Sequence, residues 1–346
     1  MKLERYTILF VPTILLGISL TEIDNFYMPN PCGMVSPPEW VDASNRFSYF
    51  ISLPDGNYVF ADYAVMNVFI YRRENRIITE LTEEHSRIVY PYSIYSDYPY
   101  LWVCDLSTHR ISRLLIDETI KSVENFSPSD LAFIPMYAVP IRDKLVIAGS
   151  KSILSDERDS IINTQIQVYN YTTGVLLSED TLSAAEYNKY ISGEGFGLSH
   201  SISYFIAPFD SGFLFCKLYK PEVVYFSLEL DTLAIIDATP QSYEPPTKFV
   251  VSFETPDEEI FDWLKTWTLT GHLCAYNDSL AVVCYQLNGY SELAFFNPIK
   301  NKIIGFTEPT KGSLMDVDEH GRLLFLTEEM DKEAVKMTLY EVDFDD

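Results

Sequence analysis

Histidines, carboxylates and a glycine-rich segment are the parts of this sequence whose residue types suit chemistry. An imidazole acts as a metal ligand or a general base only when further ligands or acids stand beside it. His200 and His272 each lie near the entry to an expected inner strand, so they are the two that could face a ligand. A structural or solvated role is the alternative. No metal-ligand spacing relates the five histidines, which are His85, His109, His200, His272 and His320.

Two acidic runs suggest calcium chemistry, and one glycine run suggests nucleotide binding. Residues 316–319 and 343–346 supply carboxylates, but neither run matches the twelve-residue calcium loop. Residues 193–197 read Gly-Glu-Gly-Phe-Gly, which lacks the GxGxxG spacing and precedes no expected helix. The sequence also has no GxSxG nucleophile elbow. We therefore expect no bound cofactor, with calcium the one ion left open. The sequence favours a non-catalytic chain and leaves catalysis open.

A repeated turn-and-strand unit must position these groups. In its first copy, the turn Asp55-Gly56 precedes an apolar tetrad at residues 58–61, and two more strand-like runs follow. The closer spacings between copies are roughly 41 to 46 residues, the length of a four-stranded propeller blade. Two spacings are longer by about 25 residues, which indicates insertions. The tetrads of the six copies begin at Tyr58, Leu101, Leu145, Phe213, Leu280 and Leu323.

The chain resembles the six-bladed β-propellers of the NHL and TolB-like type. The segments Tyr58-Val59-Phe60-Ala61-Asp62 and Leu101-Trp102-Val103-Cys104-Asp105 carry the resemblance. The expected fold is all-β, a single propeller over residues 20–346, with a β-sandwich as the competing architecture. The last unit lacks its fourth strand, so residues 21–28 are expected to complete that sheet and remove its open edge. The expected blade cores are 45–82, 88–126, 133–180, 201–239, 268–308 and 313–344.

The N-terminus and the net charge indicate location and partners. Lys2 and Arg5 precede an apolar run over residues 6–20, which is short for a membrane span and typical of a signal peptide over residues 1–19. We expect an exported protein, periplasmic or at the cell surface, with no membrane span in the mature chain. Otherwise these residues form a first strand. A net charge of −25 disfavours nucleic acid and leaves a protein or glycan partner open.

The cysteines follow the repeat. Cys104, Cys216 and Cys284 occupy the same tetrad position in three copies, and Ala61 and Ala148 occupy it in two others. Such a position selects a small apolar side chain, and equivalent residues of separate blades are too far apart for a disulfide. We predict free thiols at all five cysteines, which also include Cys32 and Cys274.

Three insertions indicate where a ligand would bind. Residues 151–164, 181–201 and 239–267 all fall on the face opposite the six Asp/Gly turns, and long loops in compact folds carry function. Residues 183–186 and 255–258 have helix-capping signals, so short helices are expected there. The candidate ligand-binding residues at the insertion-side channel mouth are Arg87, His200 and Trp267, with Glu194 in a neighbouring loop. The alternative for Trp267 is to anchor the helix that follows Pro256.

Three functions compete for this fold. The first is an exported, non-catalytic propeller that binds a protein or glycan partner on its insertion-bearing face. The second, implied by the resemblance alone, is a metal-dependent hydrolase or lactonase with its site in the central channel. The third is a structural array of blades within a larger assembly.

Overall fold

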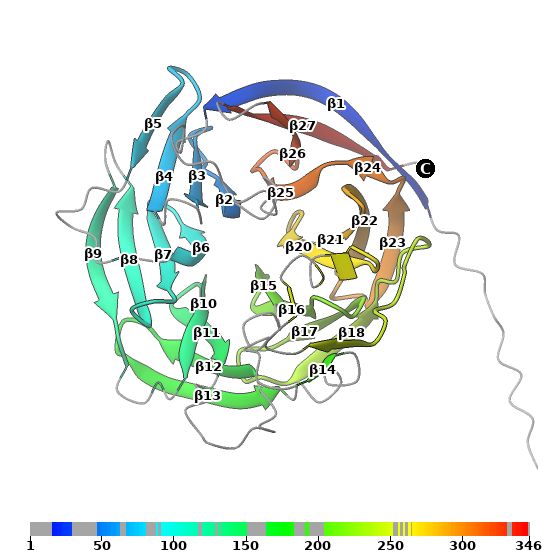
Figure 1. Cartoon of the computed structure of the whole chain (residues 1–346). Helices are drawn as coiled ribbons and strands as arrows, with labels where there is room; N and C mark the ends of the chain where they lie inside the picture. The colour runs from blue at the N-terminus through cyan, green and yellow to red at the C-terminus, as the bar shows by residue number, and fades with distance from the viewer. Residues whose placement is uncertain are drawn as a thin grey trace, which may run out of the picture.

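In the computed structural model, β-sheets are arranged side by side in a ring (Figure 1). Four of these sheets have four strands each, and the remaining large sheet has nine. The expected all-β class is confirmed. The structure describes residues 16–29, 47–62, 67–80, 88, 91–116, 120–128, 131, 133–150, 164–182, 191–193, 204–251, 255–256, 259, 262–263, 265–330 and 334–344.

Each four-stranded sheet is an antiparallel meander in which the chain visits the strands in order. The first is β2 (Phe47–Ser52), β3 (Tyr58–Asp62), β4 (Asn67–Arg72) and β5 (Ile77–Glu80). The second is β6 (Pro91–Asp97), β7 (Tyr100–Asp105), β8 (Arg110–Ile116) and β9 (Ile120–Phe126). The third is β10 (Ile134–Ile141), β11 (Lys144–Ser150), β12 (Thr164–Asn170) and β13 (Val175–Leu182). The fourth is β15 (Tyr204–Phe209), β16 (Gly212–Lys217), β17 (Glu222–Phe226) and β18 (Thr232–Asp237).

The second strand of each sheet is apolar without alternation because both of its faces are covered. Tyr58, Val59, Phe60 and Ala61 are consecutive in β3, and each is at most 3% exposed. A strand with one face in water would instead alternate apolar and polar residues. The predicted tetrads are therefore the strands that neighbouring sheets bury from both sides.

The N-terminal strand β1 (Leu16–Pro29) joins the two parts of the nine-stranded sheet. It pairs in parallel with β23 over Leu16–Ile18 and antiparallel with β27 over Ile18–Pro29. The prediction that residues 21–28 complete the last sheet is confirmed. The sheet order is β20 (Leu269–Ala275), β21 (Ala281–Leu287), β22 (Tyr290–Asn297), β23 (Lys302–Thr307), β1, β27 (Ala334–Phe344), β26 (Leu323–Met330) and β25 (Ser313–Val317), with β24 (Thr310–Lys311) beside β22.

The start of β1 overlaps the predicted signal peptide. Ile18 is 4% exposed and belongs to the apolar cluster that also contains Phe295 and Phe325. Cleavage after Ser19 would remove this side chain together with the residues that pair with β23. The boundary at residue 19 stays a prediction. Cleavage there should lower the stability of the fold, because it removes a buried side chain and three paired residues.

Six clusters of buried apolar side chains fill the spaces between neighbouring sheets. One cluster lies between β20–β23 and the strands β25, β26, β27 and β1 of the same large sheet. Cys104, Cys216 and Cys284 contribute to three clusters, as their shared tetrad position predicts. These three and Cys274 are free thiols, which confirms the prediction for them; Cys32 lies outside the described residues.

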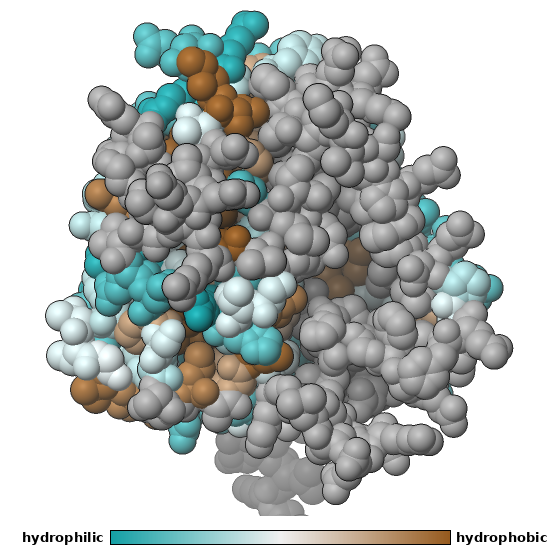
Figure 2. Space-filling model, turned by 60° about the vertical axis from the view of Figure 1, so that its left-hand side comes forward, coloured by the Kyte–Doolittle hydropathy of each residue, from teal (hydrophilic) through white to brown (hydrophobic). Residues whose placement is uncertain are grey.

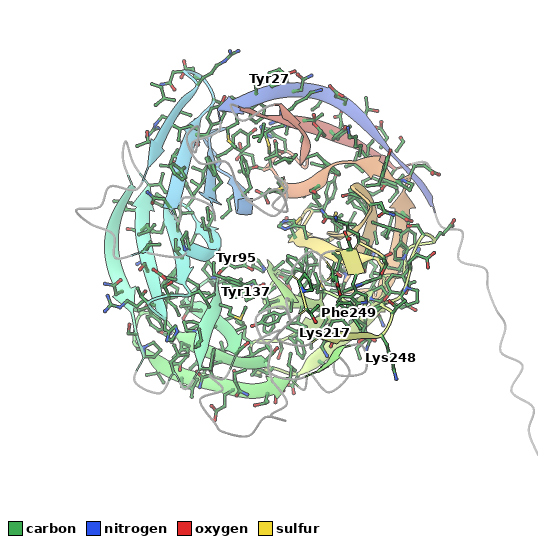
Figure 3. The ribbon with its side chains drawn as sticks, in the orientation of Figure 1. Tyr27, Tyr95, Tyr137, Lys217, Lys248 and Phe249 are labelled. Atoms are coloured by element: carbon green, nitrogen blue, oxygen red, sulfur yellow. The ribbon has the colours of Figure 1, made fainter. Side chains whose placement is uncertain are left out.

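Hydrogen bonds from inner-strand side chains connect neighbouring sheets. Ser93 Oγ donates to the carbonyl oxygen of Met136 at 2.5 Å, and the Tyr137 hydroxyl donates to the carbonyl oxygen of Tyr204. Figure 3 shows Tyr137 beside Tyr95 near the inner strands. Because each bond ends on a backbone carbonyl, it fixes the position of one sheet against the next whatever the side chain of the acceptor residue.

Little of the described chain is helical. Glu259, Asp262 and Trp263 have helical geometry after Pro256, in the connection where a short helix is predicted; the other predicted helix, at residues 183–186, lies outside the described residues. None of the described helical residues belongs to a helix that is long and apolar enough to cross a membrane. On the part of the surface that Figure 2 shows in colour, hydrophobic and hydrophilic residues are interspersed.

Candidate binding site

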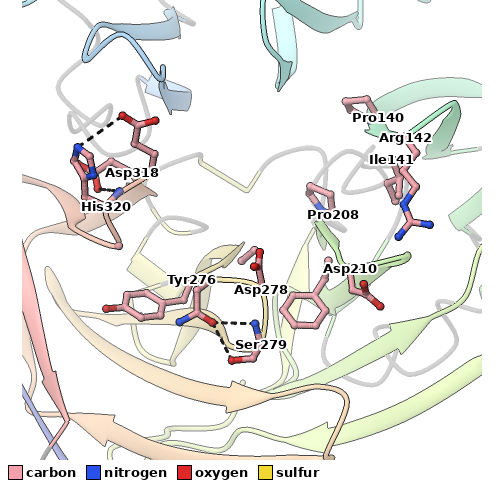
Figure 4. A pocket seen from close by; sticks show the side chains of 15 residues that line it. Pro140, Ile141, Arg142, Pro208, Asp210, Tyr276, Asp278, Ser279, Asp318 and His320 are labelled. Atoms are coloured by element: carbon pink, nitrogen blue, oxygen red, sulfur yellow. Dashed lines mark hydrogen bonds and ion pairs between the residues drawn. The ribbon is translucent and has the colours of Figure 1, made fainter.

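Four strand-to-strand turns surround a cavity of about 1170 Å³ at the centre of the ring (Figure 4). They join β10 to β11, β15 to β16, β20 to β21 and β25 to β26, and the last two belong to the nine-stranded sheet. Because the four turns line one cavity, they lie at the same end of the ring. We call this end the turn face, and the opposite end, where β11, β13 and β18 finish, the insertion face. The cavity is lined by Pro140, Ile141, Arg142, Pro208, Phe209, Asp210, Ala275, Tyr276, Asn277, Asp278, Ser279, Asp318, Glu319, His320 and Gly321.

Two of these turns are held by a side chain that accepts several hydrogen bonds from its own loop. The Asn277 Oδ1 atom accepts from the amides of Ser279 and Leu280, each at 2.9 Å. The Asp318 Oδ1 atom accepts from the amides of His320 and Arg322, also at 2.9 Å. Asn and Asp side chains are common in turns because they can replace the missing backbone partner in this way. The turns are therefore built before any ligand binds.

The other two turns are tight two-residue connections. Arg142 and Asp210 take left-handed backbone angles, with φ of 57° and 49°. Hairpin turns of this kind need a positive φ so that their twist matches that of the strands. Each turn thus presents a charged side chain at the rim of the cavity.

Carboxylates outnumber basic groups in the lining, and they differ in how they are paired. Asp318 is neutralised by Arg322, whose Nε donates to Oδ2 at 2.6 Å. Glu319 lies 3.7 Å from the imidazole of His320. Asp210 accepts a hydrogen bond from the Ser211 hydroxyl and forms no ion pair with another described residue.

Asp278 has no recorded polar partner within the described chain, and Figure 4 shows its side chain directed toward the middle of the cavity. On the far side Figure 4 places Arg142 beside Asp210. The rim thus presents to a ligand the guanidinium of Arg142 and two exposed carboxylates, Asp210 and Asp278, for which no ion pair with a described residue is found. Such a rim attracts a polar ligand that carries cationic groups.

The phenol of Tyr276 forms part of the wall. Burial, with smaller contributions from the carboxylates of Glu341 and Asp318, raises the pKa of Tyr276 above its usual value. The hydroxyl therefore stays protonated at neutral pH and serves as a hydrogen-bonding group. Within the described residues, no group of three or more His, Cys, Asp or Glu side chains is placed to hold a metal ion. The arrangement suits recognition of a ligand by charge and hydrogen bonds.

The residues predicted from the sequence as ligand contacts are placed differently. Arg87, Glu194 and His200 lie outside the described residues, so that part of the prediction stays a prediction. Trp267 is 1% exposed, and its ring packs 5.4 Å from that of Trp263. In this structure Trp267 is a buried packing residue. This agrees with the alternative in which Trp267 anchors the helical segment that follows Pro256.

Two of the predicted insertions meet on the insertion face. Strand β14 (Ile191–Gly193) pairs in parallel with β19 (Phe249–Val251), so the second insertion is joined to the third. The ring of Phe249 stacks on Trp263 at 5.2 Å, and the Trp263 indole donates to the Thr247 carbonyl at 3.1 Å.

The cavity itself was missed by reasoning from the sequence. Asp318 and Glu319 were singled out only as part of an acidic run, and the ligand site was expected on the face opposite the Asp/Gly turns. The signal that could have found the site is the charge carried by these turns, as at Arg142, Asp210 and Asp278. Equivalent turns of neighbouring blades must converge around the axis of a propeller.

Comparison with known proteins identifies the fold. No protein-family model and no curated protein sequence matches this chain. The crystal structure of a DUF4221 family member from Bacteroides vulgatus ATCC 8482 is similar, with a TM-score of 0.57 and 10% identity over 94% of this chain and 99% of that one. A putative exported protein from Bacteroides fragilis NCTC 9343 has a TM-score of 0.52 and 8% identity over 94% of this chain and 95% of that one. The WD40 repeats of RRP9 have a TM-score of 0.52 and 9% identity over 93% of this chain and 100% of that one.

This chain has a β-propeller fold. At these identities the likeness concerns the fold, and the lining of the propeller's central cavity has to be interpreted from its own residues.

Proposed function

We propose that this chain is an exported, non-catalytic, six-bladed β-propeller that binds a protein or glycan partner at the mouth of its central cavity. The cavity on the turn face is the observation that carries the proposal. It is about 1170 Å³ in volume, and its rim displays Arg142, Asp210 and Asp278. A concave site with a few convergent polar groups is the usual form of a ligand site in proteins.

The count of six blades and the resemblance to NHL and TolB-like propellers rest on the nine-stranded sheet. We take β20–β23 as one blade and β25, β26, β27 and β1 as another. In the described part of the chain, the strand pairing that joins these two halves is the short parallel one between Leu16–Ile18 and β23. An apolar cluster lies between the halves, as it does between any two neighbouring sheets of the ring. The six sequence repeats agree with this division.

Export is supported by the sequence and, weakly, by one structural neighbour. Lys2, Arg5 and the apolar run over residues 6–20 have the composition of a signal peptide. The similar structure from Bacteroides fragilis is described as a putative exported protein. We place the mature chain in the periplasm or at the cell surface.

A binding screen followed by paired variants tests the proposal. The purified protein is screened against a glycan array and a peptide-display library, and the affinity of each recovered ligand is measured by biolayer interferometry. The double variant Asp210→Asn/Asp278→Asn should weaken binding at least tenfold while the melting temperature stays within 2 °C or so, since exposed charges contribute about 0 to 1 kcal/mol to stability. The matched control is Glu229→Gln, an exposed carboxylate in the β17–β18 turn.

The same screen distinguishes the two faces. A ligand whose affinity falls with Arg87→Ala or Glu194→Gln and is unchanged by the turn-face double variant would move the site to the insertion face, as the sequence predicts. Turnover of a recovered ligand into a product would contradict the non-catalytic assignment.

A further inference from the structure

Arg113 on β8 lies among aromatic rings that come from two sheets. Its guanidinium carbon is 3.9 Å from the ring centroid of Tyr100, 5.6 Å from that of Trp102 and 5.5 Å from that of Tyr171. Trp102 is directly opposite Arg113 in the β7–β8 register, whereas Tyr171 directly follows β12 of the next sheet. The guanidinium therefore lies between the second and third sheets, toward the turn face.

The hydrogen-bonding capacity of Arg113 is largely unused. Its side chain is 19% exposed, and its buried Nε atom has no hydrogen-bond partner among the residues that the structure describes. Its ion pair with Glu124 is long, at 3.8 Å, and the Glu124 side chain is 46% exposed. A guanidinium carries five N–H donors, and leaving such donors buried without acceptors costs free energy. The exposed edge of the Arg113 guanidinium can still donate hydrogen bonds to an acceptor on another molecule.

Trp102 adds a second unsatisfied donor at the same place. The residue is 1% exposed, and its indole Nε1 is buried with no hydrogen-bond partner in the described part of the chain. Its ring packs edge-on against Tyr171, with centroids 5.4 Å apart. Stacked rings hold the guanidinium in one orientation, so it loses little conformational freedom when an acceptor arrives. Tyr98, in the turn before Tyr100, is 46% exposed.

We propose that the surface formed by Tyr100, Arg113 and Tyr171 binds a carboxylate from an acidic segment of a partner protein. The planar fork of an arginine matches a carboxylate through two parallel hydrogen bonds. Arginine and aromatic residues are also the types enriched among the residues that dominate protein interfaces. None of these three residues lines the central cavity, so this contact is additional to the site proposed above.

A peptide carboxylate fits this surface better than an acidic sugar does. A sugar ring binds proteins by stacking on an open aromatic face, but the guanidinium at 3.9 Å already covers one face of Tyr100. A side-chain carboxylate needs only the exposed edge of Arg113. The chain carries a net charge of −25, so binding is measured near 0.15 M salt, where the Debye length of about 8 Å screens distant carboxylates.

Peptide titrations of the full chain test the proposal. The probe is a fluorescein-labelled tetraglutamate peptide, compared with the matching tetraglutamine peptide by fluorescence anisotropy. We expect the tetraglutamate peptide to bind at least tenfold more tightly than the tetraglutamine peptide. Arg113→Gln should remove that difference. Arg110→Gln, three residues away on the same strand and therefore on its other side, should keep it.

A measurement on the unaltered protein covers the case in which Arg113→Gln fails to fold. Tetraglutamate should shift the Trp102 indole N–H resonance in a spectrum of ¹⁵N-tryptophan-labelled protein, with Trp102→Phe used for assignment. Equal binding of the two peptides, an unmoved Trp102 resonance at saturation, or full retention of the difference in folded Arg113→Gln would overturn the proposal. Tighter binding of a uronate tetrasaccharide than of tetraglutamate would also overturn it, in favour of a glycan.

Discussion

The carboxylate of Asp316 accepts a hydrogen bond from the backbone amide of Ser52, with 2.6 Å between Oδ2 and the amide nitrogen. Asp316 is on β25 and Ser52 ends β2, so the bond joins the innermost strands of two different sheets. Burial raises the pKa of Asp316 to about 7, and the nearby Asp318 contributes in the same direction. A group that prefers its neutral form therefore lies where the first and last repeats of the ring meet.

The pKa of Asp316 predicts how stability depends on pH. In the unfolded chain an aspartate titrates near 3.9. The folded pKa is higher, so the folded state binds the extra proton between these values, and stability falls as pH rises through about 7. Between pH 5.5 and 8 the loss should be on the order of 2 kcal/mol. Urea unfolding of the natural chain and of Asp316→Asn over this range measures the contribution, and equal slopes for the two proteins would contradict it.

The start of β1 should contribute to stability through Ile18. This side chain is 4% exposed in an apolar cluster, whereas Ile23 on the same strand is 42% exposed. Ile18→Ala removes buried methylene groups and leaves a cavity, so we expect a loss of about 2 to 4 kcal/mol. Ile23→Ala is the matched control and should cost less than about 0.5 kcal/mol.

The same measurement bears on the predicted cleavage after Ser19. A chain that begins at Leu20 should lose at least as much stability as Ile18→Ala, because it also lacks the residues that pair with β23. Undiminished stability of that shorter chain would show that the first residues of β1 are dispensable.

Trp267 distinguishes packing from ligand contact. Its indole is 1% exposed against Trp263, so Trp267→Ala should lower the free energy of unfolding by about 3 to 5 kcal/mol. Trp267→Phe keeps most of the volume and should cost clearly less. Thermal and urea unfolding of both variants is the measurement. If Trp267→Ala unfolds like the natural chain but binds a ligand more weakly, the result would support Trp267 as a ligand contact.

Gly149 should be intolerant of any side chain because a neighbouring strand approaches it closely. A Cβ atom there would lie 1.9 Å from the carbonyl oxygen of Ile134 on β10. Gly149→Ala must displace one of the two strands, and we expect a loss of more than about 3 kcal/mol or failure to fold. In Gly174→Ala the added atom meets nothing within 4 Å. The free energy of unfolding of that control should fall only by about 1 kcal/mol, because alanine is strained in a left-handed backbone conformation. Comparable losses in the two variants would refute the close-approach explanation.

The sequence by itself determined the local features of the fold. Consecutive apolar residues such as Val59 and Phe60 indicate strands buried on both faces, and their recurrence at blade length indicates a propeller. The small residue at a fixed tetrad position, as at Cys104 and Cys216, and the need for an N-terminal strand follow from the same repeat. These features depend on residues near in sequence and on the requirement to cover every sheet edge.

Only the tertiary structure decided which side chains meet. Asp210 and Asp278 belong to different sheets, and they line one cavity because equivalent turns converge at the ring centre. Arg113 and Tyr171 likewise come into contact across two sheets, and Trp267 is buried by aromatic residues of its own insertion rather than exposed at the channel mouth. Such contacts are set by the twist and separation of whole sheets, which no spacing along the chain encodes locally.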